Sequence, residues 1–322
     1  MAENTVKKIA TRESYGNSLK ELAEEFPNLV VLDADLAAAT KTGIFRKAYP
    51  DRHIDCGIAE ENMMGVAAGL SLVGKIPFVS SFAMFAAGRA FEQVRNSIGY
   101  PHLNVKIGAT HAGITVGEDG ATHQCNEDIA LMRTIPGMVV MCPSDDVEAR
   151  AAVRAALEYE GPVYIRFGRA AVPVINDHPG YHFEIGKGTV VREGKDVTIV
   201  ATGICVDSAL GAAKMLEEEG ISAEVVNICT IKPLDEEIIL NSAKKTGKVV
   251  TVEEHSVIGG LGSAVCDCLC AHYPVPVKKV GMQDVFGESG SAAALVEKYG
   301  LDAKGAVSYT HLRAHETDSY LV

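Results

Sequence analysis

The stretch HIDCGIAEENMMGVAAGLSLVGKIPFVSSF, residues 53–82, carries a helical segment and a strand in direct succession. Glu60 and Glu61 head a run of small and apolar residues that predicts a helix from about residue 61. KIPFVSSF, residues 75–82, is a short apolar run typical of a buried strand. Adjacent helical residues point about 100° apart, so at most one of the two carboxylates can face a given ligand. Acids also stabilise the first turn of a helix, which explains the pair without any function.

The same alternation continues on both sides of this stretch. Residues 12–26 have apolar side chains at helical spacing and precede the strand-like NLVVLDADL, residues 28–36. Further strands are predicted in NVKIGAT, GMVVMCPS and PVYIRFG, with helices between them. Alternating helices and nearly continuous apolar strands predict an α/β fold, in which a mostly parallel sheet is covered by helices on both faces.

The chain length and a change in composition predict two domains. At 322 residues the chain exceeds the roughly 250–300 residues that one hydrophobic core usually accommodates. Between residues 172 and 188 Pro, Gly, Asn and His accumulate and the periodicity fades, and a second, smaller helix–strand unit follows. Residues 307–322 resemble the translation of a sequencing-library adaptor. We therefore expect two domains, each a mostly parallel sheet with helices on both faces: a first domain at 1–175, a linker at 176–192, a second domain at 193–306 and a non-native tail at 307–322.

Composition excludes several classes of partner. The net charge of −12 argues against binding to nucleic acid, which depends on clustered Lys and Arg. We find neither an apolar run of membrane-spanning length nor the apolar core of a signal peptide, so we expect a cytoplasmic protein without membrane contact. The eight cysteines show no CxxC spacing, and we predict no metal site in this chain.

Two further segments have residue types that suit chemistry. In SFAMFAAGRAF, Phe82 and Phe85 are three apart beside small residues, as expected of two rings on one helical face that sandwich a flat heterocycle. Spacing of this kind is more often found in plain core packing. In THAGITVGEDGATHQCNED, three glycines mark a tightly turned loop between His111 and His123, and this loop also carries Asp119. A loop that gathers groups able to exchange protons or bind hydroxyls is a strong functional hint.

A third segment, VIGGLGSAV at residues 257–265, has a superficial likeness to a dinucleotide-binding loop. It lacks the full GxGxxG spacing, and no acidic residue ends a strand about 20 positions later. We therefore predict a tight turn between a strand and a helix.

Four segments occur in an order and at intervals that resemble the C-terminal half of transketolase. They are DADL, GIAEENMMGVAAGL, SFAMFAAGRAFEQVRNSI and HAGITVGEDGATHQCNEDIALMRTIPGM. The resemblance covers residues 12–305 and is strongest to the separately encoded C-terminal subunit of split transketolases. It implies a pyrimidine-binding domain for thiamine diphosphate followed by a transketolase C-terminal domain. The implied activity is transfer of a two-carbon ketol unit between sugar phosphates, as in the pentose phosphate pathway.

The resemblance also implies roles for individual residues. Glu60 matches the acid that bonds N1′ of the aminopyrimidine, and Glu61 has no implied role. A third aromatic of the family would fall at Gly88, and Arg166 competes with Arg169 for the place of one phosphate-binding arginine. The implied catalytic residues are Glu60, His111 and His123, the cofactor-binding residues are Asp35, Leu36, Glu60, Phe82 and Phe85, and the substrate-binding residues are Arg12, His111, Asp119 and Arg169.

The chain lacks the GDG sequence that, in the family, begins the magnesium and diphosphate site. We therefore expect it to be inactive alone and to need an N-terminal partner subunit that supplies Mg²⁺, as an α2β2 heterotetramer. Two alternatives stay open. One is the β-subunit of a 2-oxo-acid dehydrogenase E1 component or a deoxyxylulose-phosphate-synthase-like enzyme, although the GEDGATHQ loop and the paired Arg12 and Arg169 favour phosphorylated sugars. The other is a non-catalytic scaffold with a pyrimidine-type domain.

Overall fold

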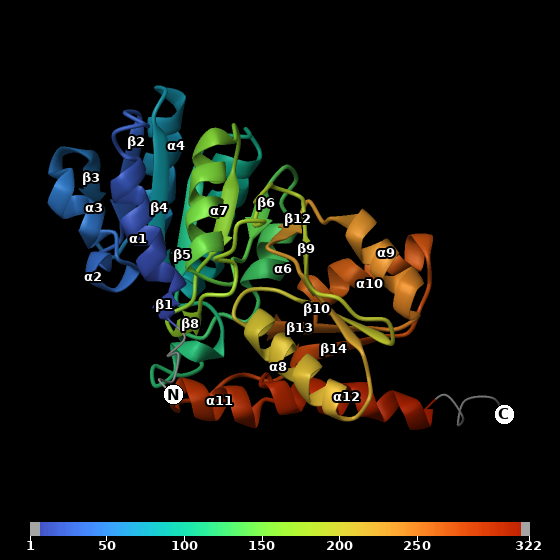
Figure 1. Cartoon of the computed structure of the whole chain (residues 1–322). Helices are drawn as coiled ribbons and strands as arrows, with labels where there is room; N and C mark the ends of the chain where they lie inside the picture. Colours follow the sequence, from blue (N-terminus) through green and yellow to red (C-terminus); the bar gives the residue numbers. More distant parts are fainter. Residues whose placement is uncertain (1–6, 317–322) are drawn as a thin grey trace.

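The computed structural model describes residues 7–316, and within them two larger sheets lie side by side with helices packed against them (Figure 1). The first sheet is built from the apolar runs predicted as strands, and its central strands are almost entirely buried. In order across the sheet its strands are β12 (Thr230–Lys232), β6 (Val139–Met141), β7 (Val163–Arg166), β5 (Lys106–Thr110), β4 (Ile76–Phe82), β2 (Leu29–Asp33) and β3 (His53–Asp55). All neighbours run parallel except β12, which is antiparallel to β6.

Helices cover both faces of this sheet because alternate strand residues point to opposite sides. In β2, Val30 and Leu32 pack on one face and Leu29 and Val31 on the other. One face is covered by α4 (Glu60–Leu72) and α6 (Asp128–Arg133), and the other by α1 (Thr11–Leu22), α3 (Gly43–Ala48) and α7 (Asp146–Glu158). Other elements of this part include β1 (Lys8–Ala10), paired with β8 (Ala171–Pro173), and the short helices α2 (Ala37–Thr40), η1 (Pro50–Arg52) and η4 (Ile114–Val116).

The second sheet forms the smaller unit. Its strands β10, β11, β13 and β14 are parallel, and β9 is antiparallel to β11 at the edge. In order they are β14 (Val277–Met282), β13 (Val249–Ser256), β10 (Val197–Ala201), β11 (Ala223–Asn227) and β9 (Thr189–Arg192). Their helices are α8 (Cys205–Glu218), α9 (Glu236–Thr246), α10 (Leu261–His272), α11 (Ala292–Lys298) and α12 (Ala303–Glu316). The predicted α/β fold with two mostly parallel sheets is confirmed.

The structure corrects the predicted boundaries in three places. The linker predicted at 176–192 contains β9, so the second sheet begins inside it. The short strand β12 comes from the predicted second domain but joins the first sheet, beside β6. The predicted tail at 307–322 overlaps α12, and Val307 is buried in the second core, because the helix that precedes the tail continues into it. Residues 317–322 lie outside the described part of the chain, and the non-native origin of the tail stays a prediction.

The helix expected between the strands KIPFVSSF and NVKIGAT is instead divided into three pieces. The structure has a π-helix η2 (Met84–Arg89), one turn of α-helix α5 (Phe91–Gln93) and a second π-helix η3 (Val94–Gly99). The wider π turns shift the side chains after Met84 around the helix axis, and such segments are frequent at functional sites.

Candidate active site

The predicted site residues meet where the parallel strands of the first sheet end. β2 ends at Asp33, β4 ends at Phe82, and β5 ends one residue before His111. Glu60 is the first residue of α4. Parallel α/β sheets bind ligands outside the carboxyl ends of their strands, because loops from several strands converge there. Segments far apart in the sequence therefore contribute to one edge of the first sheet.

Glu60 is a buried acid whose side-chain partner within residues 7–316 is Arg89. It is 2% exposed, and its Oε2 accepts a hydrogen bond of 2.9 Å from Nη1 of Arg89. The Arg89 guanidinium also lies over the ring of Phe85, with 4.4 Å from its central carbon to the ring centroid. A buried carboxylate, an aromatic ring and a planar cation thus form one unit. Gly88 stands where the resemblance places a third aromatic residue. Met84 fills the space beside it, because a Cβ added to Gly88 would lie 2.6 Å from the Met84 methyl group.

Four rings form one cluster, namely those of Phe82, Phe85, His111 and His123. The rings of Phe82 and Phe85 are within 14° of parallel, with centroids 6.0 Å apart. His111 stacks on Phe82 at 3.9 Å, and His123 meets Phe85 edge-on at 5.4 Å. The prediction that Phe82 and Phe85 share a helical face is wrong, because Phe82 is the last residue of β4 and Phe85 lies in η2. The two rings face each other because the chain turns from strand into π-helix between them.

His111 is a buried imidazole among cations. Its Nε2 lies 3.4 Å from Nη1 of Arg12, and its Nδ1 lies 2.9 Å from Oγ1 of Thr110. A guanidinium can only donate, so Nε2 accepts from Arg12 and Nδ1 carries the proton that Thr110 accepts. Burial lowers the pKa of His111 to about 3, and the charges of Arg12, Arg169 and Lys41 act in the same direction. His111 is therefore neutral at physiological pH.

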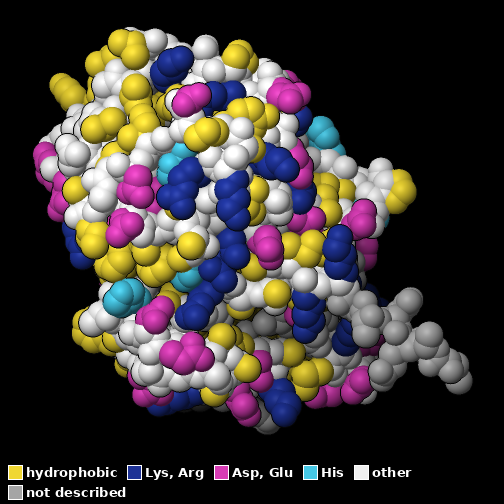
Figure 2. All heavy atoms as spheres, turned by 90° about the vertical axis from the view of Figure 1, so that its left-hand side faces the viewer, with side chains coloured by type: hydrophobic (Ala, Val, Ile, Leu, Met, Phe, Trp, Pro, Cys, Tyr) yellow, Lys and Arg dark blue, Asp and Glu magenta, His cyan; other side chains and the backbone are white. Residues whose placement is uncertain are grey.

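Three cations gather around His111. Arg12 donates to the carbonyl of Ala39 at 2.8 Å, and its pKa is lowered by burial and by the charge of Arg169. Lys41 follows α2 and has a left-handed backbone with a φ of 71°. Figure 2 shows Lys and Arg side chains in a line down the middle of one face of the molecule, with His side chains beside it. A chain with a net charge of −12 thus has a local basic surface suited to an anion.

The structure separates the two arginines that compete in the sequence. Arg166 is 5% exposed and its Nε donates to Asp128 at 2.9 Å, so its charge is used inside the protein. The side chain of Arg169 is 36% exposed and lies 3.6 Å from the carboxylates of Glu118 and Asp119. Arg169 therefore lies at the surface in contact with Asp119 of the histidine loop, whereas Arg166 is buried and paired with Asp128.

A buried carboxylate shapes the loop that carries Asp35 and Leu36. Asp33 accepts hydrogen bonds of 2.8 Å from the hydroxyls of both Thr40 and Thr42, and another from the backbone nitrogen of Leu36. Burial raises the pKa of Asp33 above its ordinary value. Asp35 itself is exposed and has a φ of 60°, and Leu36 is half-buried. Among the described residues, three of the five non-glycine positions with positive φ lie in this site, namely Asp35, Lys41 and His111, and such strained backbone clusters at active sites.

The second sheet supports the loop between the two histidines through a side chain of β13. Glu254, in β13, accepts a bond of 2.6 Å from the backbone nitrogen of Thr115 and lies 3.8 Å from the guanidinium of Arg166. Gly113 allows this approach, because a Cβ there would lie 2.3 Å from the Glu254 carboxyl carbon. Asp128 completes the buried network through Arg166. The C-terminal unit thereby positions a loop of the N-terminal unit.

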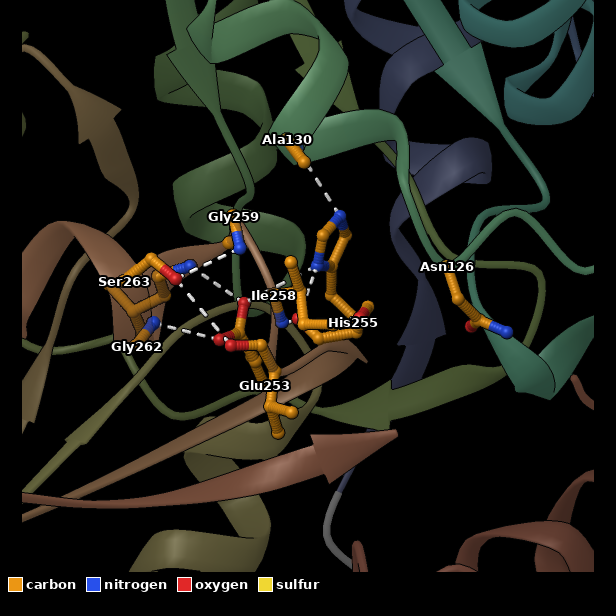
Figure 3. Close-up of polar contacts among 12 residues, drawn as sticks. Asn126, Ala130, Glu253, His255, Ile258, Gly259, Gly262 and Ser263 are labelled. Atoms are coloured by element: carbon orange, nitrogen blue, oxygen red, sulfur yellow. Dashed lines mark hydrogen bonds and ion pairs between the residues drawn. The ribbon is translucent and has the colours of Figure 1, made fainter. Parts of the chain in front are cut away.

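The neighbouring contacts of β13 have the same effect (Figure 3). His255 is fully buried, and its Nε2 accepts a bond of 3.3 Å from the backbone nitrogen of Ala130 in α6. The nitrogen of Ser256 donates to the carbonyl of Asn126 at 2.7 Å. Both bonds join β13 to the segment that follows the histidine loop.

Residues 283–291 form a second clamp on this loop. Nε2 of Gln124 lies 3.2 Å from the carbonyl of Gly117 and 2.8 Å from that of Glu288. The hydroxyl of Ser289 donates to the carbonyl of Glu118 at 2.6 Å. Sequence reasoning placed the functional residues in the first domain and missed this support, because it joins positions more than 160 residues apart.

The VIGGLGSAV segment is the predicted turn between a strand and a helix. Glu253 of β13 accepts bonds of 2.7 Å from Leu261 and 2.8 Å from Gly262, the first two residues of α10 (Figure 3). A fully buried carboxylate thus occupies the end of the helix where a dinucleotide would place its phosphates.

Two features are absent from residues 7–316. No group of three or more His, Cys, Asp or Glu side chains in this part of the chain is arranged to bind a metal ion. None of the helices described there combines the length and the apolar character that crossing a membrane requires.

Sequence reasoning missed Arg89, Lys41 and Asp33 as members of the site. Arg89 belongs to the AGRAF motif, yet ordinary helical geometry did not indicate that it reaches back to Glu60. Asp33 begins the DADL motif, so the motif pointed to it, although only its neighbours Asp35 and Leu36 were selected. Lys41 directly follows α2, and no pattern in the sequence identified it.

The fold and this constellation define a class, two-domain α/β proteins with a ligand site at the carboxyl edge of the first sheet. Residues 7–174 match the transketolase pyrimidine binding domain, and residues 186–305 match the transketolase C-terminal domain. The chain belongs to the transketolase family and corresponds to its C-terminal section.

Individual relatives agree with this assignment. A protein described as a transketolase C-terminal section from Methanocaldococcus jannaschii is 52% identical over 295 residues, which are 91% of this chain and 92% of the relative. A 6-deoxy-6-sulfo-D-fructose transketolase subunit from a Clostridium species is 50% identical over 93% of each chain. A solved structure of a split-gene transketolase, described as an inactive β4 tetramer, is 59% identical with a TM-score of 0.87 and covers 95% of this chain and 98% of its own. Human transketolase is 37% identical over 92% of this chain, which spans 47% of that longer protein.

Proposed function

We propose that this chain is the C-terminal subunit of a thiamine-diphosphate-dependent transketolase, a transferase that moves a two-carbon ketol unit between sugar phosphates. The observation that carries the proposal is the unit formed by Glu60 and Phe85. A buried carboxylate beside an aromatic ring at the carboxyl edge of a parallel sheet is a seat for a flat heterocycle with N–H groups.

The residues present fit the pyrimidine end of the cofactor. The guanidinium of Arg89, a flat group with N–H donors, bonds to Glu60 while it lies over Phe85, so the seat already accepts a group of this kind. Glu60 would bond a pyrimidine nitrogen, Phe85 and Phe82 would flank the ring, and Asp35 and Leu36 would lie at its margin. When bound, thiamine diphosphate supplies a nucleophilic carbon and an electron sink for breaking a C–C bond next to a carbonyl.

The substrate side is built from the histidines and cations. Neutral His111 would accept a hydrogen bond from a sugar hydroxyl at Nε2 in place of the bond from Arg12, and His123 lies next to it across the Phe82 ring. Arg12, Lys41 and Arg169 place positive charge where a phosphate would neutralise it, since guanidinium groups bind phosphate oxygens through two parallel bonds. Asp119, beside Arg169, would bind a sugar hydroxyl.

A partner subunit completes the enzyme in this proposal. The diphosphate and Mg²⁺ would be held by an N-terminal transketolase subunit, and two copies of each chain would form an α2β2 assembly with sites at the interfaces. The relative described as an inactive β4 tetramer supports the inference that this chain self-associates and is inactive alone. The inference that a partner supplies Mg²⁺ rests on the lack, in this chain, of the GDG sequence of the family's diphosphate site.

The test is reconstitution. The purified chain, alone and mixed with a candidate N-terminal subunit, is titrated with thiamine diphosphate and Mg²⁺ by calorimetry, and ketol transfer from xylulose 5-phosphate is measured in parallel. Binding and turnover in the mixture alone support the proposal. Tight magnesium-dependent binding by the isolated chain would contradict the assignment of the diphosphate to a partner.

The same experiment addresses the alternatives. A 1-deoxy-D-xylulose-5-phosphate synthase from Heliobacterium modesticaldum is 40% identical over 90% of this chain, which keeps that reaction class as a second candidate. A reconstituted complex that decarboxylates pyruvate and ignores xylulose 5-phosphate would favour it, or the E1 β-subunit. Unchanged turnover after Glu60→Gln would favour a non-catalytic scaffold.

A further inference from the structure

Arg89 makes, within the chain, the two contacts that the proposed function requires of the aminopyrimidine. Its Nη1 donates to Glu60 at 2.9 Å, and its guanidinium covers the Phe85 ring at 4.4 Å. A guanidinium is flat, carries N–H donors and stacks on aromatic faces, as an aminopyrimidine does. Both groups cannot occupy the same face of Phe85 and the same carboxylate oxygen.

The two partners in this pair differ in exposure. The side chain of Glu60 is 2% exposed and that of Arg89 is 45% exposed. Glu60 starts a helix packed into the core, whereas Arg89 is the last residue of the π-helix η2 and reaches the site from the surface. Arg89 can therefore leave into solvent by rotating its own side chain, and Glu60 cannot.

The pair of Arg89 and Glu60 stabilises the chain when no cofactor is bound. A buried carboxylate without a partner is unfavourable, and among the described residues Arg89 is the side chain that bonds to Glu60. The guanidinium satisfies the acid and covers the ring until a ligand does both.

We propose that Arg89 occupies the pyrimidine seat of the free subunit and must leave both Glu60 and Phe85 before thiamine diphosphate can bind. The inference rests on the proposed function, which identifies the ligand. It makes Arg89 a positioning residue with opposite effects on the two states of the protein: it stabilises the free chain and competes with the cofactor.

The experiment compares Arg89→Met, Arg89→Lys and the wild type in the complex reconstituted with an N-terminal subunit. Calorimetry gives the Kd for thiamine diphosphate with Mg²⁺, and thermal unfolding of the free chain gives its Tm. We expect Arg89→Met to bind the cofactor about five- to twentyfold more tightly and to have a lower Tm as the free chain. Arg89→Lys keeps the charge for Glu60 but lacks the flat group, so we expect intermediate values of both.

Arg95→Met is the matched control, because Arg95 is an exposed arginine of η3 that bonds to its neighbour Asn96. It should match the wild type in both measurements. Weaker or unchanged cofactor binding by Arg89→Met, with normal binding by the wild type, overturns this inference alone, since Arg89 would then support Glu60 in the loaded state too. A wild-type complex that binds no thiamine diphosphate overturns the proposed function and this inference together.

Discussion

Two arginine–carboxylate pairs in this molecule have the same N–O distance of 2.9 Å and opposite surroundings. Arg166 and Asp128, at the junction of the two sheets, are 5% and 0% exposed. Arg89 and Glu60, at the candidate active site, are 45% and 2% exposed. In the first pair both partners are fixed, and in the second only the acid is. The same N–O distance therefore occurs in a fully buried pair at the junction and in a pair whose arginine is exposed to solvent.

The surrounding bonds explain the difference. Nη2 of Arg166 also donates to the carbonyls of Cys125 and Glu254, and Asp128 accepts from the hydroxyl of Tyr164 at 2.8 Å. Desolvated charges are stable only when such additional bonds satisfy them. The Arg89 side chain is exposed to solvent, which satisfies its remaining N–H groups without additional bonds inside the protein.

The largest effect is expected from breaking the buried pair. Arg166→Met leaves two carboxylates, Asp128 and Glu254, buried without their cation, which costs about 3–5 kcal/mol. We expect the free energy of unfolding, measured with denaturant, to fall by that amount or the chain not to fold. Arg154→Met, which removes an exposed pair with Glu25, should leave the unfolding midpoint close to that of the wild type. Equal losses in both variants would contradict the contrast between buried and exposed pairs.

The next effect concerns the acid of the exchangeable pair. Glu60→Gln preserves the shape of the side chain and can still accept a bond from Arg89, so stability should change little. Ketol transfer by the reconstituted complex should fall by about 100-fold or more, as expected when an acid–base group is removed. Glu61→Gln, one position along the same helix, is the control and should keep wild-type turnover. Similar losses in both variants would mean that the helix, rather than the Glu60 carboxyl, matters.

A third experiment uses pH to test the electrostatics of the site. The pKa of His111 is lowered from 6.5 in the unfolded chain to about 3, so the unfolded state binds more protons between these values. The contribution of neutral His111 to stability is complete above pH 6.5 and is lost as pH falls toward 3. His111→Gln should therefore make the free energy of unfolding depend less on pH between about 6 and 4, by up to about one proton.

The control for that experiment is His178→Gln, because His178 is exposed. Its pH dependence should equal that of the wild type. If His111→Gln also shows the wild-type slope, the imidazole is not held neutral by its surroundings.

The smallest effect is expected at Lys41, a single half-buried charge. Lys41→Met should raise the KM of the reconstituted enzyme for a sugar phosphate about three- to tenfold with little change in kcat, since a screened charge contributes modestly to binding. The KM for an unphosphorylated sugar should not change. Lys47→Met, on the exposed side of α3, is the control. An equal rise of KM in this variant would mean that Lys41 acts only through its long-range charge and not through a local contact.

Much of the fold could be predicted because it depends on local patterns. The apolar runs at 28–36 and 75–82 became β2 and β4. The helix expected between GMVVMCPS and PVYIRFG became α7, with Asp145 capping its first turn. The boundaries could not be predicted where local patterns and packing disagree. β9 directly follows a stretch rich in Pro and Gly, which by itself indicates a linker. β12 is a three-residue strand, and its partner residues in β6 lie 89 or more positions earlier in the chain.

For the site, residue types could be predicted and their relations could not. The histidines, both phenylalanines and Arg169 lie together as the resemblance implied, whereas their roles in catalysis stay predictions. The pairing of Arg89 with Glu60 was not predicted, since a π-helix shifts the phase of every later side chain and leaves no clear mark in the sequence.

The sequence by itself determined the α/β class, the order of the elements and the presence of an acid at the start of α4, because hydrophobic periodicity and turn residues act over a few neighbouring positions. Only the tertiary structure decided which arginine is buried and which faces the site, that His111 is neutral, and that Arg89 covers Phe85. Those outcomes depend on burial and on charges brought together from distant segments, and both exist only once the two sheets have packed.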